Sequence, residues 1–388
     1  MYRIGQEEID EITKVIQAKN LFRMNNGLQE VDHFERELAE KVGVSYAICV
    51  SGGTAALTCA LAGLGIGPGD EVIVPAYTFM ATALAVTSVG AIPVLAEIDE
   101  TMTIDLDDVE RKLSPRVKAV IPVDMVGFPC DMARLCQMSR AHGFKVVEDA
   151  CQADGGSFQG KRLGSWGDAG AFSFNDYKII TAGEGGAVLT SDRQVYERAL
   201  IYHDGGATFR PSAKDLQEPL FMGTSYRVSE ITGALLHVQL GRLDGILADL
   251  RRVKKALQAG LTGMKGIRFA PSLDSEGDCG TTLALQFDSE TQARAFAAGV
   301  SGWLPIDSGK HVYRNWTPLM AKLGAHHPAR NPFNLPENRE LRTDYDAGMC
   351  PRTLDILART VYISLHPDWN EEKINQVITS CQQAENQL

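Results

Sequence analysis

The sequence lacks any long hydrophobic run. No stretch approaches the roughly 20 apolar residues that a membrane-spanning helix requires, and the first residues, MYRIGQEEIDEI, do not show the basic-then-apolar pattern of a leader. We therefore expect a cytoplasmic protein without a membrane segment. A basic excess is missing too, because 49 acidic residues outnumber 38 Lys and Arg and give a net charge of −11. This balance argues against general binding of nucleic acid or anionic membranes.

Paired cysteines are also missing. The chain has eight Cys, none of them in a CxxC arrangement, and they are scattered through apolar runs. This distribution favours reduced, mostly buried thiols over disulfides or a zinc site, and we expect no metal centre.

Short apolar runs alternate with helical patterns between about residues 30 and 190. The runs Tyr46–Val50, Glu71–Pro75 and Lys145–Asp149 have the apolar character of strands in a parallel sheet that helices cover on both faces. The alternation predicts an α/β fold with a large, doubly wound and mainly parallel sheet. Ligands of such a sheet bind at the carboxyl ends of its strands.

The regular alternation of strands and helices ends after Asp149, where Gly-rich turns and short strands replace the helices. A long helical region over 229–261 then leads to a second group of strands. Because the chain is longer than one compact core usually allows, we expect two domains. The large domain is predicted over 1–250 and a smaller α+β domain over 251–388, with segment 1–25 packing on the small domain.

The first candidate site is the segment Ser51-Gly52-Gly53-Thr54, between the strand YAICV and the helix that begins at Thr54. Glycines let the backbone approach an anion closely, and the free N–H groups of a helix start point toward it. An ordinary glycine turn capped by Thr54 explains the same residues equally well. A P-loop is excluded because no Gly-Lys-Ser/Thr ending follows.

The second candidate site is the end of the strand that contains Glu148 and Asp149. A carboxylate at the sheet edge needs a partner, because burying an unpaired charge is costly. A protonated pyridine nitrogen would be such a partner, whereas a simple cap on the next turn is the structural alternative.

The third candidate is Lys178, in the run FSFNDYK that precedes the glycine-rich turn GEGG. Apolar and small residues surround it, which favours an uncharged amine able to form an imine. Taken alone, a lysine beside a glycine-rich loop is more often a solvated surface residue.

The order of the three segments resembles the DegT/DnrJ/EryC1/StrS family of sugar aminotransferases, which have the fold-type I architecture of enzymes that use pyridoxal 5′-phosphate (PLP). The resemblance extends from about Phe22 to Tyr362 and rests on EDACQADGGSFQGKRLG and FSFNDYKIITAGEGGAV. It implies that Lys178 is the catalytic lysine that carries PLP as a Schiff base. It also implies the remaining contacts: Asp149 at the pyridinium nitrogen, Gln152 at the phenolic oxygen, Phe79 stacked on the ring, and Gly53, Thr54 and Ser173 at the phosphate.

One position departs from the family pattern. The family usually has Asn in the segment that reads GTSYR here, and that Asn reaches the phosphate in the neighbouring subunit. Ser225 stands in its place; it keeps a hydrogen-bond donor but is shorter. The resemblance implies a homodimer with active sites at the interface.

The implied reaction moves an amino group from glutamate or glutamine to a keto or aldehyde sugar in amino-sugar biosynthesis. The segment KHVYRNW, within the loop-rich stretch 303–352, resembles the family branch that aminates Kdo-like keto-deoxy sugars, which are lipopolysaccharide components, at C8. Such an acidic acceptor needs basic or polar partners, and the candidates are Arg23, Lys310, His311, Tyr313, Arg314, Arg339 and Arg342. Nucleotide-linked keto-hexoses and inosose-type cyclitols stay open as acceptors.

Two functions other than transamination also stay open. A PLP-binding regulator would hold the cofactor and show no spectral change with an amino donor. A PLP lyase would need a reactive thiol on a mobile loop, for which Cys350 is the nearest candidate.

Overall fold

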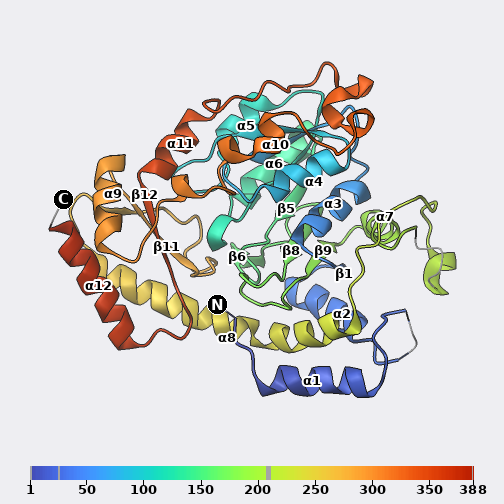
Figure 1. Cartoon of the computed structure of the whole chain (residues 1–388), viewed down its shortest axis with the longest axis horizontal. Coiled ribbons are helices and arrows are strands. Elements are labelled where there is room, and N and C mark those ends of the chain that lie inside the picture. Colours follow the sequence, from blue (N-terminus) through green and yellow to red (C-terminus); the bar gives the residue numbers. More distant parts are fainter. Residues whose placement is uncertain (1, 25–26, 207–210, 387) are drawn as a thin grey trace.

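The computed structural model describes residues 2–24, 27–206, 211–386 and 388, and its centre is a seven-stranded sheet (Figure 1). The strand order is β1-β9-β8-β5-β4-β2-β3. β9 runs antiparallel to both of its neighbours, and the other strands pair in parallel. The strands are β1 (Tyr46–Val50), β2 (Glu71–Pro75), β3 (Ile92–Ala96), β4 (Val117–Val120), β5 (Lys145–Asp149), β8 (Ala169–Ser173) and β9 (Gly186–Thr190). The predicted α/β fold with a mainly parallel sheet is confirmed.

Helices connect these strands and pack against the sheet. Side-chain caps explain several of their starts: Asp105, Asp131 and Asp192 each accept hydrogen bonds from the backbone N–H groups of the following turn. The helices of this part are α2 (Glu30–Val42), α3 (Gly53–Gly63), α4 (Ala81–Ser88), α5 (Leu106–Lys112), α6 (Met132–His142) and α7 (Arg193–His203). A short hairpin, β6 (Ser157–Phe158) and β7 (Lys161–Arg162), follows β5.

A second, smaller unit has an antiparallel three-stranded sheet in the order β10-β11-β12. Its elements are β10 (Arg268–Phe269), β11 (Thr282–Gln286), α9 (Glu290–Gly299), α11 (Pro351–Ala358), β12 (Thr360–Ser364) and α12 (Glu371–Glu385). The helix α8 (Glu230–Leu261) reaches from the large sheet to this unit without a break (Figure 1). The boundary expected at residue 250 falls inside α8, so the two parts share one helix.

The N-terminal helix α1 (Gln6–Gln17) packs along α8 (Figure 1). The carboxylate of Glu8 accepts hydrogen bonds from Gln239 and Arg242 of α8. Arg3 pairs with Asp249 of α8 and also reaches Asp368 near the C-terminus. The expected packing on the small domain is therefore limited to the Arg3 contact.

Residues 303–352 contain only short helical turns, such as α10 (Thr317–Met320) and the 3-10 turns η3 (Pro305–Asp307), η4 (Tyr313–Asn315), η5 (Pro328–Arg330), η6 (Pro332–Asn334) and η7 (Pro336–Asn338). The segment begins on the small sheet, where Trp303 pairs with Tyr362 of β12, and its later residues pack on the large sheet. Arg342 pairs with Glu71 of β2, and the Tyr345 hydroxyl donates to the Pro93 carbonyl in β3. The segment that was assigned to the small domain therefore starts at the small sheet and returns to the β2–β3 edge of the large one.

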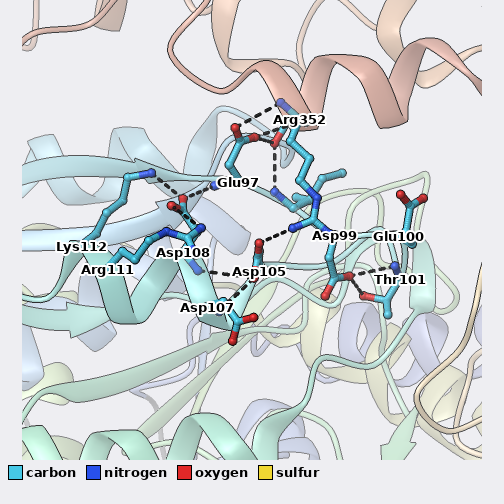
Figure 2. Close-up of polar contacts among 12 residues, drawn as sticks. Glu97, Asp99, Glu100, Thr101, Asp105, Asp107, Asp108, Arg111, Lys112 and Arg352 are labelled. Carbon is cyan, nitrogen blue, oxygen red and sulfur yellow. Dashed lines mark hydrogen bonds and ion pairs between the residues drawn. The ribbon is translucent and has the colours of Figure 1, made fainter.

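A cluster of charged residues joins the end of β3 to α11 (Figure 2). The Glu97 carboxylate accepts hydrogen bonds from the backbone N–H groups of Arg352 and Thr353, at 3.2 and 2.7 Å. The Arg352 guanidinium pairs with Asp105 at 2.5 Å. The large unit thus caps the first turn of a helix in the small one.

The eight cysteines are all free, and six of them are buried. Within the described part of the chain, no helix is both long and apolar enough to cross a membrane.

Candidate active site

Three separate segments meet at the carboxyl end of the sheet. Gly53 opens α3 directly after β1, and a Cβ added there would lie 2.9 Å from both the Ser173 Cβ and the Cys151 Sγ. A Cβ on Gly186, at the start of β9, would lie 2.5 Å from the backbone of Gly52. Only glycine fits at these two positions, and the SGGT, FSF and GEGG motifs therefore form one compact cradle.

Asp149 ends β5 and is 5% exposed. Its Oδ2 accepts a hydrogen bond from the Thr82 hydroxyl at 2.8 Å, and its Oδ1 accepts one from the Cys151 N–H at 3.3 Å. Both donors are neutral, and within the described residues no Lys, Arg or His forms an ion pair with Asp149. A buried carboxylate held in this way suits a cationic ligand group.

Gln152 lies on the loop that follows Asp149. Its Oε1 accepts a hydrogen bond from the backbone N–H of Val126 at 3.2 Å. This bond fixes the amide so that its NH₂ group is the free donor. Val126 has a φ of 49°, which is strained for a β-branched residue, and this turn presents its N–H toward Gln152.

Lys178 lies half-buried in the turn between β8 and β9, where its backbone N–H donates to the Asn175 carbonyl at 3.0 Å. Its charge acts on Cys151, Asp154 and His311, three residues from two distant segments. The Lys178 charge is therefore felt both in the loop after β5 and in the 303–352 loop.

The 303–352 loop reaches the site through backbone pairing. Thr78 N–H donates to the His311 carbonyl at 3.0 Å, and Met80 N–H donates to the Lys310 carbonyl at 3.1 Å. Phe79, between them, is 39% exposed, and its ring centroid lies 5.8 Å from that of His311. The Lys310 ammonium lies 5.7 Å from the Phe79 ring and 5.5 Å from the Tyr177 ring. Phe79, Lys310 and His311 thus form one wall, and Lys310 also meets Tyr177, the residue before Lys178.

His311 is held as a neutral imidazole. Burial, together with the Lys310 and Lys178 charges, lowers its pKa from 6.5 to about 4. Its Nδ1 lies 2.6 Å from the Ser308 hydroxyl. The ring is therefore fixed in orientation and uncharged near neutral pH.

The remaining sequence candidates lie in different settings. Arg23 is buried and its guanidinium already pairs with Asp32 and Glu35 of α2, at 2.9 and 3.0 Å. The buried Tyr313 hydroxyl donates to the Ala347 carbonyl and accepts from the Cys350 N–H. Both side chains are therefore engaged in holding the fold, whereas Arg314 is exposed.

Ser225 is exposed and its backbone pairs with Asp204 in an isolated bridge. The carbonyl of the next residue, Tyr226, accepts a hydrogen bond from the Ser51 N–H at 2.9 Å. Ser225 therefore lies next to the glycine turn of its own chain. Thr54, on the first turn of α3, is also exposed and open to a ligand.

Sequence reasoning missed Thr82, Cys151, Asp154 and Tyr177. Cys151 and Asp154 are inside the EDACQAD motif, so their motif position was the available signal. Thr82 is three residues after Phe79 and binds Asp149, which only the fold reveals. Tyr177 is 77% exposed and directly precedes Lys178.

The residues fit PLP. The glycine cradle and the N-terminus of α3 suit a phosphate, the unpaired Asp149 suits a protonated ring nitrogen, and the Gln152 amide offers a donor. Phe79 offers an aromatic face, and Lys178 offers the amine.

The sequence profile of the DegT/DnrJ/EryC1/StrS aminotransferase family matches residues 2–298. The chain belongs to this family. Aminotransferases of this family depend on PLP, which is the cofactor that the site fits.

Individual relatives agree with this assignment. The chain is 41% identical over 221 residues to a GDP-perosamine synthase of Caulobacter vibrioides, with 57% of this chain and 58% of the relative covered. It is 30% identical over 383 residues to the spore coat polysaccharide biosynthesis protein SpsC of Bacillus subtilis, with 97% and 93% covered. The matches to the first curated relatives span less than two thirds of their lengths, 58% and 60%.

Solved structures share the fold. The crystal structure of 3-amino-5-hydroxybenzoic acid synthase superposes with a TM-score of 0.82 at 27% identity, covering 100% of this chain and 98% of that one. An aminotransferase from Psychrobacter cryohalolentis superposes with a TM-score of 0.83 at 26% identity, with 100% and 98% covered.

Proposed function

We propose that the protein is a PLP-dependent aminotransferase that moves an amino group from glutamate or glutamine to a keto or aldehyde sugar. The observation that carries this proposal is the buried Asp149 carboxylate, which has neutral donors and no cationic partner in the described chain. It lies close to the glycine cradle, in which Cys151 of the loop after Asp149 packs near Gly53. Relatives with printed names such as GDP-perosamine synthase support the sugar class.

Each side chain has a defined task. When bound, PLP supplies an electron sink that stabilises a carbanion. Asp149 keeps a proton on the ring nitrogen, and the Gln152 amide donates a hydrogen bond that orients the ring. Lys178 removes a proton from the α-carbon of the amino donor and later returns one to the acceptor carbon.

We propose an acceptor that carries an anionic group, such as a nucleotide-linked keto-hexose or a Kdo-type sugar acid. The support is Lys310, an exposed ammonium between two aromatic rings that forms no ion pair with a described carboxylate. Because His311 is neutral, Lys310 is the cation among the three residues of this wall.

An uncharged inosose-type cyclitol is the second candidate. An L-glutamine:2-deoxy-scyllo-inosose aminotransferase of Streptomyces kanamyceticus is 36% identical over 236 residues, with 59% of this chain and 55% of the relative covered. This acceptor has no anionic group for Lys310 to bind.

Amino-donor exchange tests the activity. Glutamate added to the purified protein should remove the visible absorbance of the bound cofactor, and a panel of keto-sugars and cyclitols should then restore it. A pure PLP-binding regulator predicts no spectral change with any donor. The lyase alternative loses its support because Cys350 is fully buried and burial raises the pKa of its thiol to about 12.

We also propose a homodimer. Phe22, Tyr177 and Met222 are 48%, 77% and 90% exposed, and large exposed apolar side chains are typical of protein interfaces. Light scattering after gel filtration should give twice the mass of the 42.2 kDa chain. A monomer at micromolar concentration would contradict this proposal.

A further inference from the structure

Asp154 is a buried acid to which the proposed roles assign no task. It lies on the loop after β5, two residues beyond Gln152, and its side chain is 0% exposed. Neither Oδ1 nor Oδ2 has a hydrogen-bond partner in the described chain. Buried carboxylates are normally paired or hydrogen-bonded, since an isolated buried charge is costly. Asp154 is therefore either protonated or able to form an ion pair with a cationic group that moves to it.

The environment of Asp154 identifies that partner. Burial raises the pKa of Asp154 well above its ordinary value, and the Lys178 ammonium is the charged group that lowers it. The two groups interact without a direct ion pair in this structure. Lys178 is half-buried, and its amine ends a flexible side chain that can change rotamers.

We propose that Asp154 is a positioning residue that receives the Lys178 amine whenever this amine is not bound to a carbonyl group. One proton moves from the Asp154 carboxyl to the Lys178 amine, an ion pair forms, and no other reactant is needed. When the Lys178 ammonium returns this proton to Asp154, the neutral amine can again attack a carbonyl group, and Asp154 stays neutral. The inference rests on the proposed function, in which Lys178 is the lysine that holds the cofactor.

Other titratable groups face this pair from several elements. Cys151 lies on the same loop and Cys279 precedes β11; burial raises the pKa of both thiols well above the ordinary value, so they stay uncharged. His311 is neutral, and Lys310 adds positive charge from the 303–352 loop. Asp149 acts on Cys151 from the sheet side. Asp154 is thus the acid in this group that is fully buried and has no hydrogen-bond partner.

The test measures the reactivity of the Lys178 amine directly. Full-length protein freed of cofactor is treated with acetic anhydride over a range of pH, and acetylation of the Lys178 peptide is quantified by mass spectrometry. In Asp154→Asn the ammonium loses its counter-charge, so we expect acetylation near neutral pH to be faster, on the order of tenfold. Asp154→Glu should return the rate toward that of the wild type.

Asp124→Asn is the matched control. Asp124 is also 0% exposed and has one unpartnered carboxylate oxygen, but the largest influences on its raised pKa are burial and Glu148. This variant should leave acetylation of Lys178 unchanged. An unchanged rate in Asp154→Asn, or an equal increase in Asp124→Asn, overturns the proposal. If Asp154→Asn does not fold, Asp154→Ser takes its place with the same expected increase.

A second readout separates this inference from the proposed function. Borohydride reduction of the holoenzyme should fix the cofactor on the Lys178 peptide in the wild type and in every variant above. A cofactor fixed on another lysine overturns the proposed function. Fixation on Lys178 together with unchanged acetylation in Asp154→Asn overturns the role of Asp154 alone.

Discussion

At the scale of single residues, two adjacent acids at the end of β5 have different surroundings. Asp149 meets the Thr82 hydroxyl on the ligand side, whereas Glu148 accepts a hydrogen bond from the Trp166 N–H at 2.9 Å. Successive side chains of a strand point to opposite faces of the sheet. The Asp149 carboxylate therefore faces the cradle, whereas the Glu148 carboxylate binds the backbone on the other face. Burial raises the pKa of Glu148 to about 7, which leaves it partly neutral.

We expect Asp149→Asn to lower kcat by roughly 100-fold or more, because Asn keeps the hydrogen bonds but removes the charge that holds a proton on the ring nitrogen. Steady-state kinetics with glutamate as donor measures this loss, and cofactor absorbance checks that PLP still binds. Glu148→Gln is the control and should keep kcat within a few-fold. Equal losses in both variants would contradict the assigned role of Asp149.

The low pKa of His311 predicts how the stability of the folded chain depends on pH. Its pKa is about 4 in the folded chain and about 6.5 when unfolded, so the unfolded state binds the extra proton first as pH falls. His311 therefore costs stability below pH 6.5, and the cost reaches about 3 kcal/mol at pH 4. Urea unfolding at pH 7.5 and pH 4 should show His311→Gln gaining about this amount relative to the wild type. His366→Gln, at a half-exposed position, should gain much less.

At the scale of elements, the sequence predicts strands that consist of continuous apolar runs. It does not predict which distant segments pair in the folded chain. The bounds predicted for β1, β2 and β5 match the structure because their residues are apolar and turn residues end them. The start of α4 at Ala81 was not readable in this way, because the backbone just before it pairs with Lys310 and His311. Arg23 was predicted to bind substrate because its partners, Asp32 and Glu35, come close only in the fold.

The cap that β3 provides for α11 gives a prediction at the same scale. Glu97→Gln weakens charge-assisted hydrogen bonds to the Arg352 and Thr353 N–H groups (Figure 2). We expect a loss of about 1–3 kcal/mol in the free energy of unfolding. Thermal or urea denaturation measures it. Asp107→Asn, which removes an ion pair between the exposed Asp107 and Arg134, should cost clearly less, because exposed ion pairs contribute little to stability. A larger loss in Asp107→Asn would contradict the capping role of Glu97.

At the scale of the whole molecule, the site is assembled from segments that are far apart in the sequence. The cradle comes from β1 and β8, the acid from β5, and the outer wall from Lys310 and His311 of a loop that returns to the large sheet. The motifs revealed the cradle and the acid, because each was contiguous. The return of the loop depends on contacts such as Arg342 with Glu71, which no local pattern encodes.

Because these segments converge only in the folded chain, PLP should bind the native state and not the unfolded one. We expect PLP to raise the Tm of cofactor-free protein in a concentration-dependent way, with about 2.7 kcal/mol of stabilisation at 100 times its Kd. Differential scanning fluorimetry over a range of PLP concentrations measures this shift. Lys178→Ala should need more PLP for the same shift, since the covalent link is lost, and pyridoxal without its phosphate should give a smaller shift because the α3 N-terminus has no anion to bind. An equal shift with pyridoxal would place phosphate recognition outside the SGGT cradle.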